Sequence, residues 1–390
     1  RALDFDNTEI VLPIEATVWE VALPEEQPLR LCHWGYVHTS ILKDQPEAAL
    51  RDQAEHGTNV FVSLFKPLGE FDEEGALVGE LDFSEHDAYL EKHAPQGRIL
   101  FYTYQRGIKG PAPELSEAWK KAHVAYLRRW FAHLNGMGIG YDRFALYPVD
   151  EPGLREGLVE RFIALSKLIR QADPNVRIYA DPVGGASMEE LERMAPYIDI
   201  WCPHRNGIVL EPETGKLDFI LSEEETTYTY ECQDRAKNRS PLAYYRAQAW
   251  LAWARGLDGI GFWSYCTSRY DPWYFSGQSE YLLVYQGDGV VPSKRWEAVR
   301  DGVEDYTMLA LLRERTEAAA EAGRAAEAVA AARQLLGGRA EDIARYCGID
   351  EDGDLPGVDG LPAVRAVAGR RWRAIEETRA EMARLLKELE

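Results

Sequence analysis

The sequence predicts an α/β protein built on a (β/α)8 barrel, the TIM-barrel fold, and three observations support this prediction. Short apolar stretches that suit buried parallel strands recur along the chain, and amphipathic stretches with helical periodicity separate them. The alternation continues for roughly 290 residues, close to the about 250 residues of an average barrel plus insertions. An open doubly wound sheet is the alternative, but neither Gly-x-Gly-x-x-Gly nor Gly-x-x-x-x-Gly-Lys follows any predicted strand.

The predicted elements follow one another in a regular order. Each strand is short and rich in β-branched or aromatic residues. The strands are expected to begin near Leu31, Val60, Ile99, Phe144, Val176, Ile198, Thr227 and Ile260. Helices are expected at residues 46–56, 84–93, 114–137, 154–172, 188–195, 241–256 and 294–315, and a short helix is expected before Glu225.

Two segments flank the predicted barrel. Residues 9–14 and 17–23 alternate apolar and polar residues, which predicts two strands that pack on the barrel or remain from a larger β domain. After about residue 316 the composition shifts to Ala, Arg and Glu, and residues 317–336 and 363–389 are predicted to be amphipathic helices. We therefore expect an N-terminal β segment at 1–28, a catalytic barrel at 29–316 and a C-terminal α-helical extension at 317–390.

Charge and composition restrict the partners of the chain. The formal net charge of -21 disfavours nucleic acid and anionic membranes, because both are bound through basic surface. No apolar run is long enough for a transmembrane helix, and no signal peptide is visible after Arg1. We expect a soluble protein that is either cytoplasmic or exported with its signal absent from this chain. The five cysteines are widely spaced without a Cys-x-x-Cys pair, and we expect neither a metal nor another cofactor.

The segment at residues 144–153 carries the main functional signal. It reads Phe-Ala-Leu-Tyr-Pro-Val-Asp-Glu-Pro-Gly, so a buried strand leads directly into the adjacent acids Asp150 and Glu151. Crowded carboxylates disfavour each other's ionisation, and a fold seldom places two of them there without a use. Because barrel enzymes carry their catalytic groups at the carboxyl ends of the strands, we predict that Asp150 and Glu151 are the catalytic pair.

The same rule extends the predicted site to residues at the other strand ends, where acids and aromatic rings predominate. Asp181 follows the fifth strand. The candidates for substrate binding are Tyr104, Tyr147, Trp201, His204, Tyr230, Glu231, Trp263, Tyr265, Asp271 and Trp273. Aromatic rings cover the apolar faces of sugars, polar groups bind their hydroxyls, and paired carboxyls hydrolyse glycosidic bonds. This combination predicts a glycoside hydrolase with a carbohydrate substrate.

Several motifs resemble one known family. They are Tyr147-Pro-x-Asp-Glu-Pro152, Tyr230-x-Cys232, Trp250-Leu-Ala-Trp253, Gly256-Leu-Asp-Gly259-Ile-Gly-Phe-Trp263, Leu283-Val-Tyr-x-Gly-x-Gly289, Ser293-x-Arg-Trp296 and Glu304-Asp-Tyr306. In these motifs the chain resembles the catalytic domain of glycoside hydrolase family 123, over about residues 16–315.

The resemblance implies a retaining exo-acting β-N-acetylgalactosaminidase with a (β/α)8 catalytic domain after a β-sandwich. It implies that Glu151 is the general acid/base and that Asp150 holds the substrate's 2-acetamido group, whose carbonyl oxygen then attacks the anomeric carbon. No protein nucleophile is needed in this scheme, and the substrate is the non-reducing end of a glycan. The chain departs from the family pattern in having only a trace of the sandwich domain and in carrying Glu231 where an apolar residue is expected.

The residues themselves leave two alternatives to this substrate-assisted mechanism open. In the first, Glu151 is the acid/base and Glu231 is a nucleophile, as in retaining β-glycosidases with carboxyl groups about 5–5.5 Å apart. Asp150 argues against it, because an Asn usually precedes the acid/base in those enzymes. In the second, the barrel binds carbohydrate without catalysis, since a fold does not determine a function.

Overall fold

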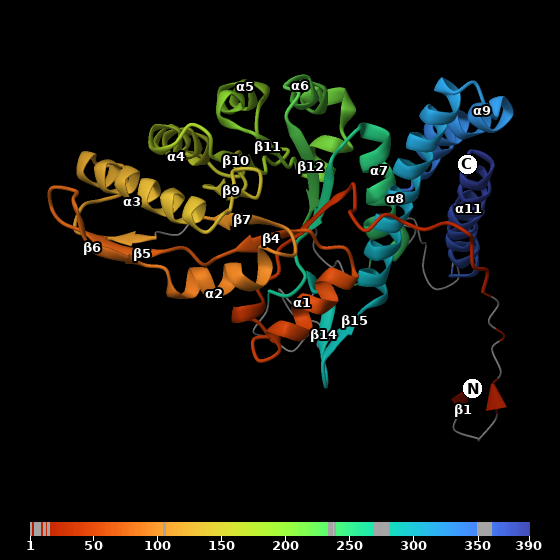
Figure 1. Ribbon diagram of the computed structural model, residues 1–390, viewed down its shortest axis with the longest axis horizontal. Coiled ribbons are helices and arrows are strands. Elements are labelled where there is room, and N and C mark those ends of the chain that lie inside the picture. The colour runs from red at the N-terminus through yellow and green to blue at the C-terminus, as the bar shows by residue number, and fades with distance from the viewer. Residues whose placement is uncertain are drawn as a thin grey trace.

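The eight predicted strands form one closed parallel barrel in the computed structural model, which confirms the predicted fold (Figure 1). Neighbours along the chain pair in order, and the last strand pairs with the first through Gly259–Arg30 and Phe262–His33. The barrel strands are β3 (Arg30–His33), β4 (Val60–Ser63), β7 (Arg98–Tyr102), β9 (Phe144–Tyr147), β10 (Arg177–Ala180), β11 (Ile200–Trp201), β12 (Thr226–Glu231) and β13 (Gly259–Phe262).

The structure describes most of the chain. The described residues are 2–3, 9–10, 13, 16–103, 107–232, 237, 239–267, 273, 281–348 and 361–390, with side chains given from residue 371 in the last helix. Tyr104 and Asp271, two of the predicted substrate-binding residues, lie outside the described residues.

A helix follows every barrel strand, as the alternating pattern predicted. These helices are α1 (Pro46–Glu55), α2 (Ser84–His93), α3 (Glu117–Gly136), α4 (Leu158–Ala172), α5 (Met188–Met194), α6 (Lys216–Ser222), α7 (Ala247–Arg255) and α8 (Lys294–Glu321). Helix α4 begins at Leu158, four residues later than predicted, because Gly157 has a left-handed φ of 82° that a continuous helix does not contain.

Short strands between the barrel strands and their helices form two small additional sheets. Strands β5 (Leu68–Phe71), β6 (Leu77–Asp82) and β8 (Ile108–Lys109) form a small sheet, and Figure 1 shows β5 and β6 beside α3. Strands β14 (Val284–Gln286) and β15 (Val290–Pro292) form a hairpin in the loop between β13 and α8.

The C-terminal extension continues directly from the barrel. Helix α8 runs through residue 316, and α9 (Ala326–Gln334), α10 (Ala340–Ala344) and α11 (Leu361–Glu388) complete the extension, with α9 and α11 beside α8 (Figure 1). A buried ion pair of 2.8 Å between Arg246 Nε and Asp305 Oδ2 links α8 to the short π-helix before α7. No helix in the described parts of the chain combines the length and the apolar character needed to cross a membrane.

The N-terminal segment differs from the prediction. Residues 17–23 contain no strand, because a closed barrel offers no free edge for a further strand. They lie instead along α11, where Glu20 pairs with Lys387 and the Arg379 guanidinium lies 5.9 Å from the Trp19 ring centre. Among the described residues before the barrel, β1 (Ala2–Leu3) and β2 (Glu9–Ile10) pair as a separate antiparallel two-stranded sheet.

Alternation along each strand decides which side chains reach the lumen. On β12, Tyr228 and Tyr230 point inward, whereas Thr227, Thr229 and Glu231 point toward the helices. The side chains packed inside the barrel are Cys32, Trp34, Val60, Val62, Leu100, Ala145, Tyr147, Tyr179, Ile200, Cys202, Tyr228 and Tyr230. These side chains fill the middle of the lumen, and the predicted site concerns the layer at its carboxyl mouth.

Candidate active site

The two adjacent acids lie at the carboxyl mouth of the barrel, on a strained turn after β9. Glu151 has a left-handed φ of 46°, a conformation that costs a residue with a Cβ about 1–3 kcal/mol. Gly153 has a φ of 96°, and a Cβ at this position would lie 2.5 Å from the Ala186 side chain. Such strain persists only where surrounding contacts enforce it, and it concentrates at functional sites.

Asp150 is held from the barrel side. The Tyr147 hydroxyl lies 2.6 Å from Asp150 Oδ1, and Tyr147 itself points from β9 into the lumen. Tyr36, at the mouth after β3, lies close enough to Asp150 for its charge to act on the phenol, and the Trp263 indole donates to the Tyr36 oxygen. Burial and the nearby Asp150 charge raise the pKa of Tyr36. Tyr36 is therefore a neutral group beside the Asp150 carboxylate.

Glu151 lines the pocket at this mouth. The Tyr230 hydroxyl donates to Glu151 Oε1 at 2.5 Å, so β9 and β12 meet through this bond. The pocket has a volume of about 410 Å³, which is within the usual range for small-molecule sites. Its lining residues are Glu151, Gly153, Leu154, Val183, Gly184, Gly185, His204 and Cys232.

A third carboxyl group, Asp181, lies beneath the pair. It follows β10 and is fully buried. Its Oδ1 accepts the Glu151 backbone N–H at 3.1 Å, and its Oδ2 contacts the Tyr147 hydroxyl. Burial, reinforced by the Asp150 charge, raises the pKa of Asp181 well above the usual range. Asp181 thus favours the protonated form.

Three of the predicted binding residues lie beside the acids: Tyr147, His204 and Tyr230. A fourth, Trp263, is linked to them through its hydrogen bond to Tyr36. The His204 ring lies edge-on to Tyr230 with 5.0 Å between centres, and Tyr281 packs against Trp263 at 4.6 Å. Burial raises the pKa of Tyr147 and Tyr230 well above the usual range, so both phenols remain neutral hydrogen-bond donors.

Three other candidates are placed elsewhere. Ile200 and Cys202 point into the lumen, so Trp201 between them points the other way, and its ring packs among the core residues that face the helices. The Tyr265 hydroxyl donates to Asp52 on α1 at 2.7 Å, behind the barrel wall. Glu231 points outward from β12 and is bound by Arg205, whose Nε lies 2.8 Å from Oε2. None of the three reaches the mouth.

Trp273 occupies an intermediate position. It lies in the loop after β13, is 59% exposed, and stacks on Tyr285 with 4.5 Å between ring centres. Its indole donates to the Gln286 carbonyl at 3.2 Å. It forms an exposed aromatic face on the loop that follows the last barrel strand.

Sequence reasoning missed Tyr36 and gave Asp181 no role. Each lies two residues after a side chain that points into the lumen: Tyr36 follows Trp34 in this way, and Asp181 follows Tyr179. Alternate residues of a strand point the same way, so this two-residue spacing would have identified both residues once the inward face of each strand was known.

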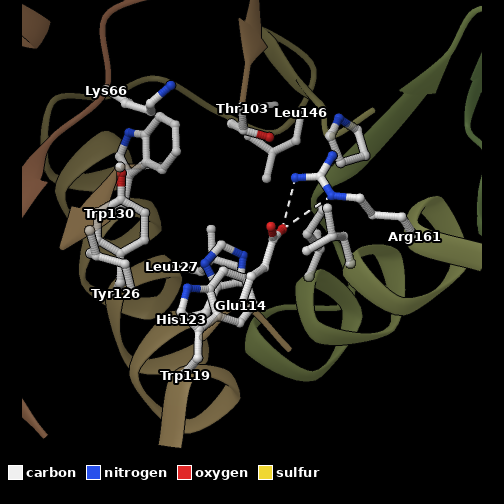
Figure 2. A pocket seen from close by; sticks show the side chains of 15 residues that line it. Lys66, Thr103, Glu114, Trp119, His123, Tyr126, Leu127, Trp130, Leu146 and Arg161 are labelled. Atoms are coloured by element: carbon white, nitrogen blue, oxygen red, sulfur yellow. Dashed lines mark hydrogen bonds and ion pairs between the residues drawn. The ribbon is translucent and has the colours of Figure 1, made fainter. Parts of the chain in front are cut away.

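A second cavity lies outside the barrel wall, between β9, α3 and α4 (Figure 2). Figure 2 shows Glu114 and Arg161 facing each other in this cavity, and Arg161 Nη2 donates to Glu114 Oε1 at 2.8 Å. Its volume of about 30 Å³ holds about two water molecules and excludes a sugar ring. The pocket beside Glu151 is therefore the better candidate for a ligand site.

One group in the described part of the chain has metal-ligand residue types: His86, Asp87 and His133, between α2 and α3. Trp130 Nε1 donates to His86 Nε2 at 2.8 Å, so the ring proton is on Nδ1, which donates to Asp87 at 2.8 Å. His133 Nε2 lies 2.9 Å from the same carboxylate. Both nitrogens of His86 are thus engaged in hydrogen bonds, and this arrangement fits a structural role rather than metal ligation.

Known proteins share this architecture. Residues 104–312 match the family model described as glycoside hydrolase 123, catalytic domain. A family 123 glycoside hydrolase from Clostridium perfringens, studied for glycolipid glycan hydrolysis, has a similar structure, with a TM-score of 0.64 and 14% identity over 93% of this chain and 72% of that chain. At this identity the likeness shows the fold.

More distant barrels are also similar. An endo-β-1,4-mannanase from Thermotoga petrophila has a TM-score of 0.47 and 15% identity, over 73% of this chain and 78% of that chain. A monomeric β-xylosidase from Caulobacter crescentus has a TM-score of 0.48 and 12% identity, over 70% of this chain and 68% of that chain. Among curated proteins no relative matches the chain.

Proposed function

This chain belongs to the glycoside hydrolase 123 family through its catalytic domain, and from this premise we propose that it is a retaining exo-β-N-acetylhexosaminidase that uses substrate-assisted catalysis. The observation that supports the proposal best is the different setting of the two adjacent acids. Glu151 lines the open pocket, whereas Asp150 is held from the lumen by Tyr147. One acid is thus placed for proton transfer at the scissile bond and the other for orienting a neighbouring group.

The proposed reaction has two steps. Glu151 protonates the glycosidic oxygen while the 2-acetamido carbonyl oxygen attacks the anomeric carbon, which breaks the glycosidic bond and forms an oxazolinium ion. Asp150 accepts a hydrogen bond from the acetamido N–H and stabilises the positive charge. Glu151 then removes a proton from water, which attacks the anomeric carbon and reopens the ring. Two inversions give net retention, and the protein supplies no nucleophile.

The converging residues would form the sugar site. We assign Tyr147, Tyr230 and His204 to polar contacts and Trp263 to an aromatic wall, because apolar sugar faces pack on such rings. The resemblance favours N-acetylgalactosamine at the non-reducing end of a glycan. By analogy with the Clostridium perfringens enzyme, a glycolipid glycan is a reasonable first natural substrate to test.

A panel of nitrophenyl glycosides tests this proposal. We expect turnover of 2-acetamido-2-deoxy-β-glycosides, no turnover of the corresponding plain β-galactoside and β-glucoside, and competitive inhibition by a thiazoline analogue of the oxazolinium ion. Equal turnover of the plain sugars would exclude assistance by the acetamido group. Sugar binding without turnover of any glycoside in the panel would instead support a non-catalytic barrel.

The environment of Glu231 weighs against the mechanism with two glutamates. Arg205 is fully buried and also donates to the Tyr244 carbonyl at 2.7 Å and to Gln248 at 2.9 Å. His204 Nδ1 accepts the Gly207 N–H at 3.3 Å, which leaves Nε2–H directed at Glu231 Oε1, 3.4 Å away. Glu231 thus pairs with Arg205 and orients His204, and its side chain is fully buried, which is not the setting expected of a nucleophile.

The variant Glu231→Gln separates the two mechanisms. We expect it to lose about 3 kcal/mol of unfolding free energy, because the buried Arg205 charge loses its partner, and to keep kcat per folded molecule within about tenfold. Urea unfolding and active-site-normalised kinetics measure both quantities. Glu225→Gln is the control, because Glu225 is an exposed acid directly before the amino end of the same strand. Loss of all turnover in a fully folded Glu231→Gln protein would favour the nucleophile role.

A further inference from the structure

The contacts of Asp181 with both halves of the catalytic turn are not explained by the proposed reaction. Its Oδ1 accepts the backbone N–H of Glu151, the residue with the left-handed φ of 46°. Its Oδ2 contacts the Tyr147 hydroxyl, which also lies 2.6 Å from Asp150 Oδ1. Asp181 therefore touches Glu151 directly and Asp150 through one intervening hydroxyl.

The position of the Tyr147 hydroxyl determines that one of the two neighbouring carboxyl groups is protonated. It lies between two carboxyl groups but carries a single proton, so it can donate to only one of them. The other carboxyl must then carry a proton of its own and donate to the Tyr147 oxygen. Asp150 is exposed to solvent, which stabilises its charge, whereas Asp181 is fully buried. The proton is accordingly placed on Asp181, and the chain of donors runs from Asp181 through Tyr147 to Asp150.

We propose that Asp181 is a positioning residue: a neutral carboxylic acid that donates to Tyr147, so that the Tyr147 proton points at Asp150, and that holds the Glu151 amide with its other oxygen. The proposal rests on the roles proposed for Asp150 and Glu151. It gives Asp181 no contact with substrate. Its effect is to keep Asp150 charged and oriented while Glu151 stays on its strained turn.

The charged surroundings of Asp181 agree with this protonation state. The charges that act on it most strongly are those of Asp150 and Glu151, and both oppose its ionisation. The titratable groups that face it are Tyr147, Asp150 and Glu151 from β9 and its loop, Tyr179 on β10, Cys32 and Tyr36 from β3 and its loop, Cys202 after β11 and Tyr230 on β12.

Activity measurements on two substitutions test the positioning role. Asn at 181 reproduces the neutral acid, since its amide donates to Tyr147 and its oxygen accepts the Glu151 N–H, whereas Ala removes both contacts. We expect Asp181→Asn to keep kcat within about threefold and Asp181→Ala to lose kcat by about 10²-fold with little change in KM. In a Tyr147→Phe background, which interrupts the relay to Asp150, the Ala and Asn variants should differ much less in kcat.

Asp199→Asn is the matched control. Asp199 also accepts a backbone N–H, from Ile178 at 2.6 Å, and pairs with Arg170 at 2.7 Å, but it lies at the opposite end of the strands. It should lower Tm without changing kcat per folded molecule. If Asp181→Ala behaves like this control, Asp181 is only structural. If Asp181→Asn loses as much kcat as Asp181→Ala, the neutral acid is excluded.

Thermal unfolding tests the protonation state without any substrate. A buried acid with a raised pKa stabilises the fold at low pH, and this contribution is lost as the pH rises through the folded-state pKa. Asp181→Asn does not titrate, so its Tm relative to the wild type should rise by about 2 °C or more between pH 4.5 and pH 8. A difference that does not change with pH overturns the proposal. Failure of the wild type to hydrolyse N-acetylhexosaminides would overturn the proposed reaction, but the pH dependence of Tm would still show whether Asp181 is protonated.

Discussion

Replacing Glu151 with Gln is expected to lower kcat for a glycan substrate by about three orders of magnitude. General acid/base catalysis contributes about 10²–10⁴ in rate, and the amide can neither protonate the glycosidic oxygen nor activate water. A nitrophenolate leaving group needs little protonation, so kcat/KM for the nitrophenyl glycoside should fall much less than kcat/KM for the glycan. Steady-state kinetics with both substrates measures this difference.

The comparison of the losses in kcat/KM for the two substrates identifies the role of Glu151. Glu160→Gln, on the exposed face of α4 where Glu160 pairs with Arg193, is the control and should leave both substrates unaffected. A general acid predicts unequal losses for the two leaving groups. Equal losses would mean that Glu151 contributes binding or stability instead, and the assignment of proton transfer to Glu151 would be withdrawn.

Replacing Asp150 with Asn should lower kcat by about 10²–10³-fold for 2-acetamido substrates while changing KM little. The substitution keeps the shape of the side chain but removes the negative charge, which is needed mainly when positive charge develops on the acetamido group. Binding of the thiazoline analogue should weaken by a similar factor, because it resembles the charged intermediate. Kinetics and calorimetric titration with this inhibitor test both expectations.

Asp142→Asn is the matched control, because Asp142 is an exposed acid before the amino end of the same strand β9. It should leave kcat and inhibitor affinity unchanged. An Asp150→Asn protein with wild-type kcat would remove the basis for substrate assistance. In combination with an inactive Glu231→Gln protein, it would point to the two-glutamate mechanism.

The sequence predicted the barrel well because the signal is repeated in every unit. Each strand is a short apolar run, and each is followed by a helix, so all eight positions and the closure of the barrel were confirmed. The predicted strand at 17–23 was wrong because an alternating pattern says nothing about whether a pairing edge is free. The start of α4 was placed too early because the left-handed Gly157 is one glycine among many in the sequence.

The candidate site was predictable only in part. The starts of the strands were located to within two residues, which was enough to identify Asp150 and Glu151 as acids that follow the fourth strand. It was not enough to separate Tyr230 from Glu231, neighbours that point to opposite sides of the barrel wall. A buried parallel strand is apolar on both faces, so its sequence does not reveal which face turns inward.

From the sequence alone came the alternation of strands and helices, the crowded pair of acids after the fourth strand, and the family motifs. Tertiary structure alone decided which strand-end residues share the mouth with those acids. Tyr230 reaches Glu151 across 79 positions of sequence, and Asp181 meets the same turn from β10. The physical reason is that a local pattern encodes burial, whereas proximity across the barrel arises only when the strands close and their registers determine which alternate side chains point inward.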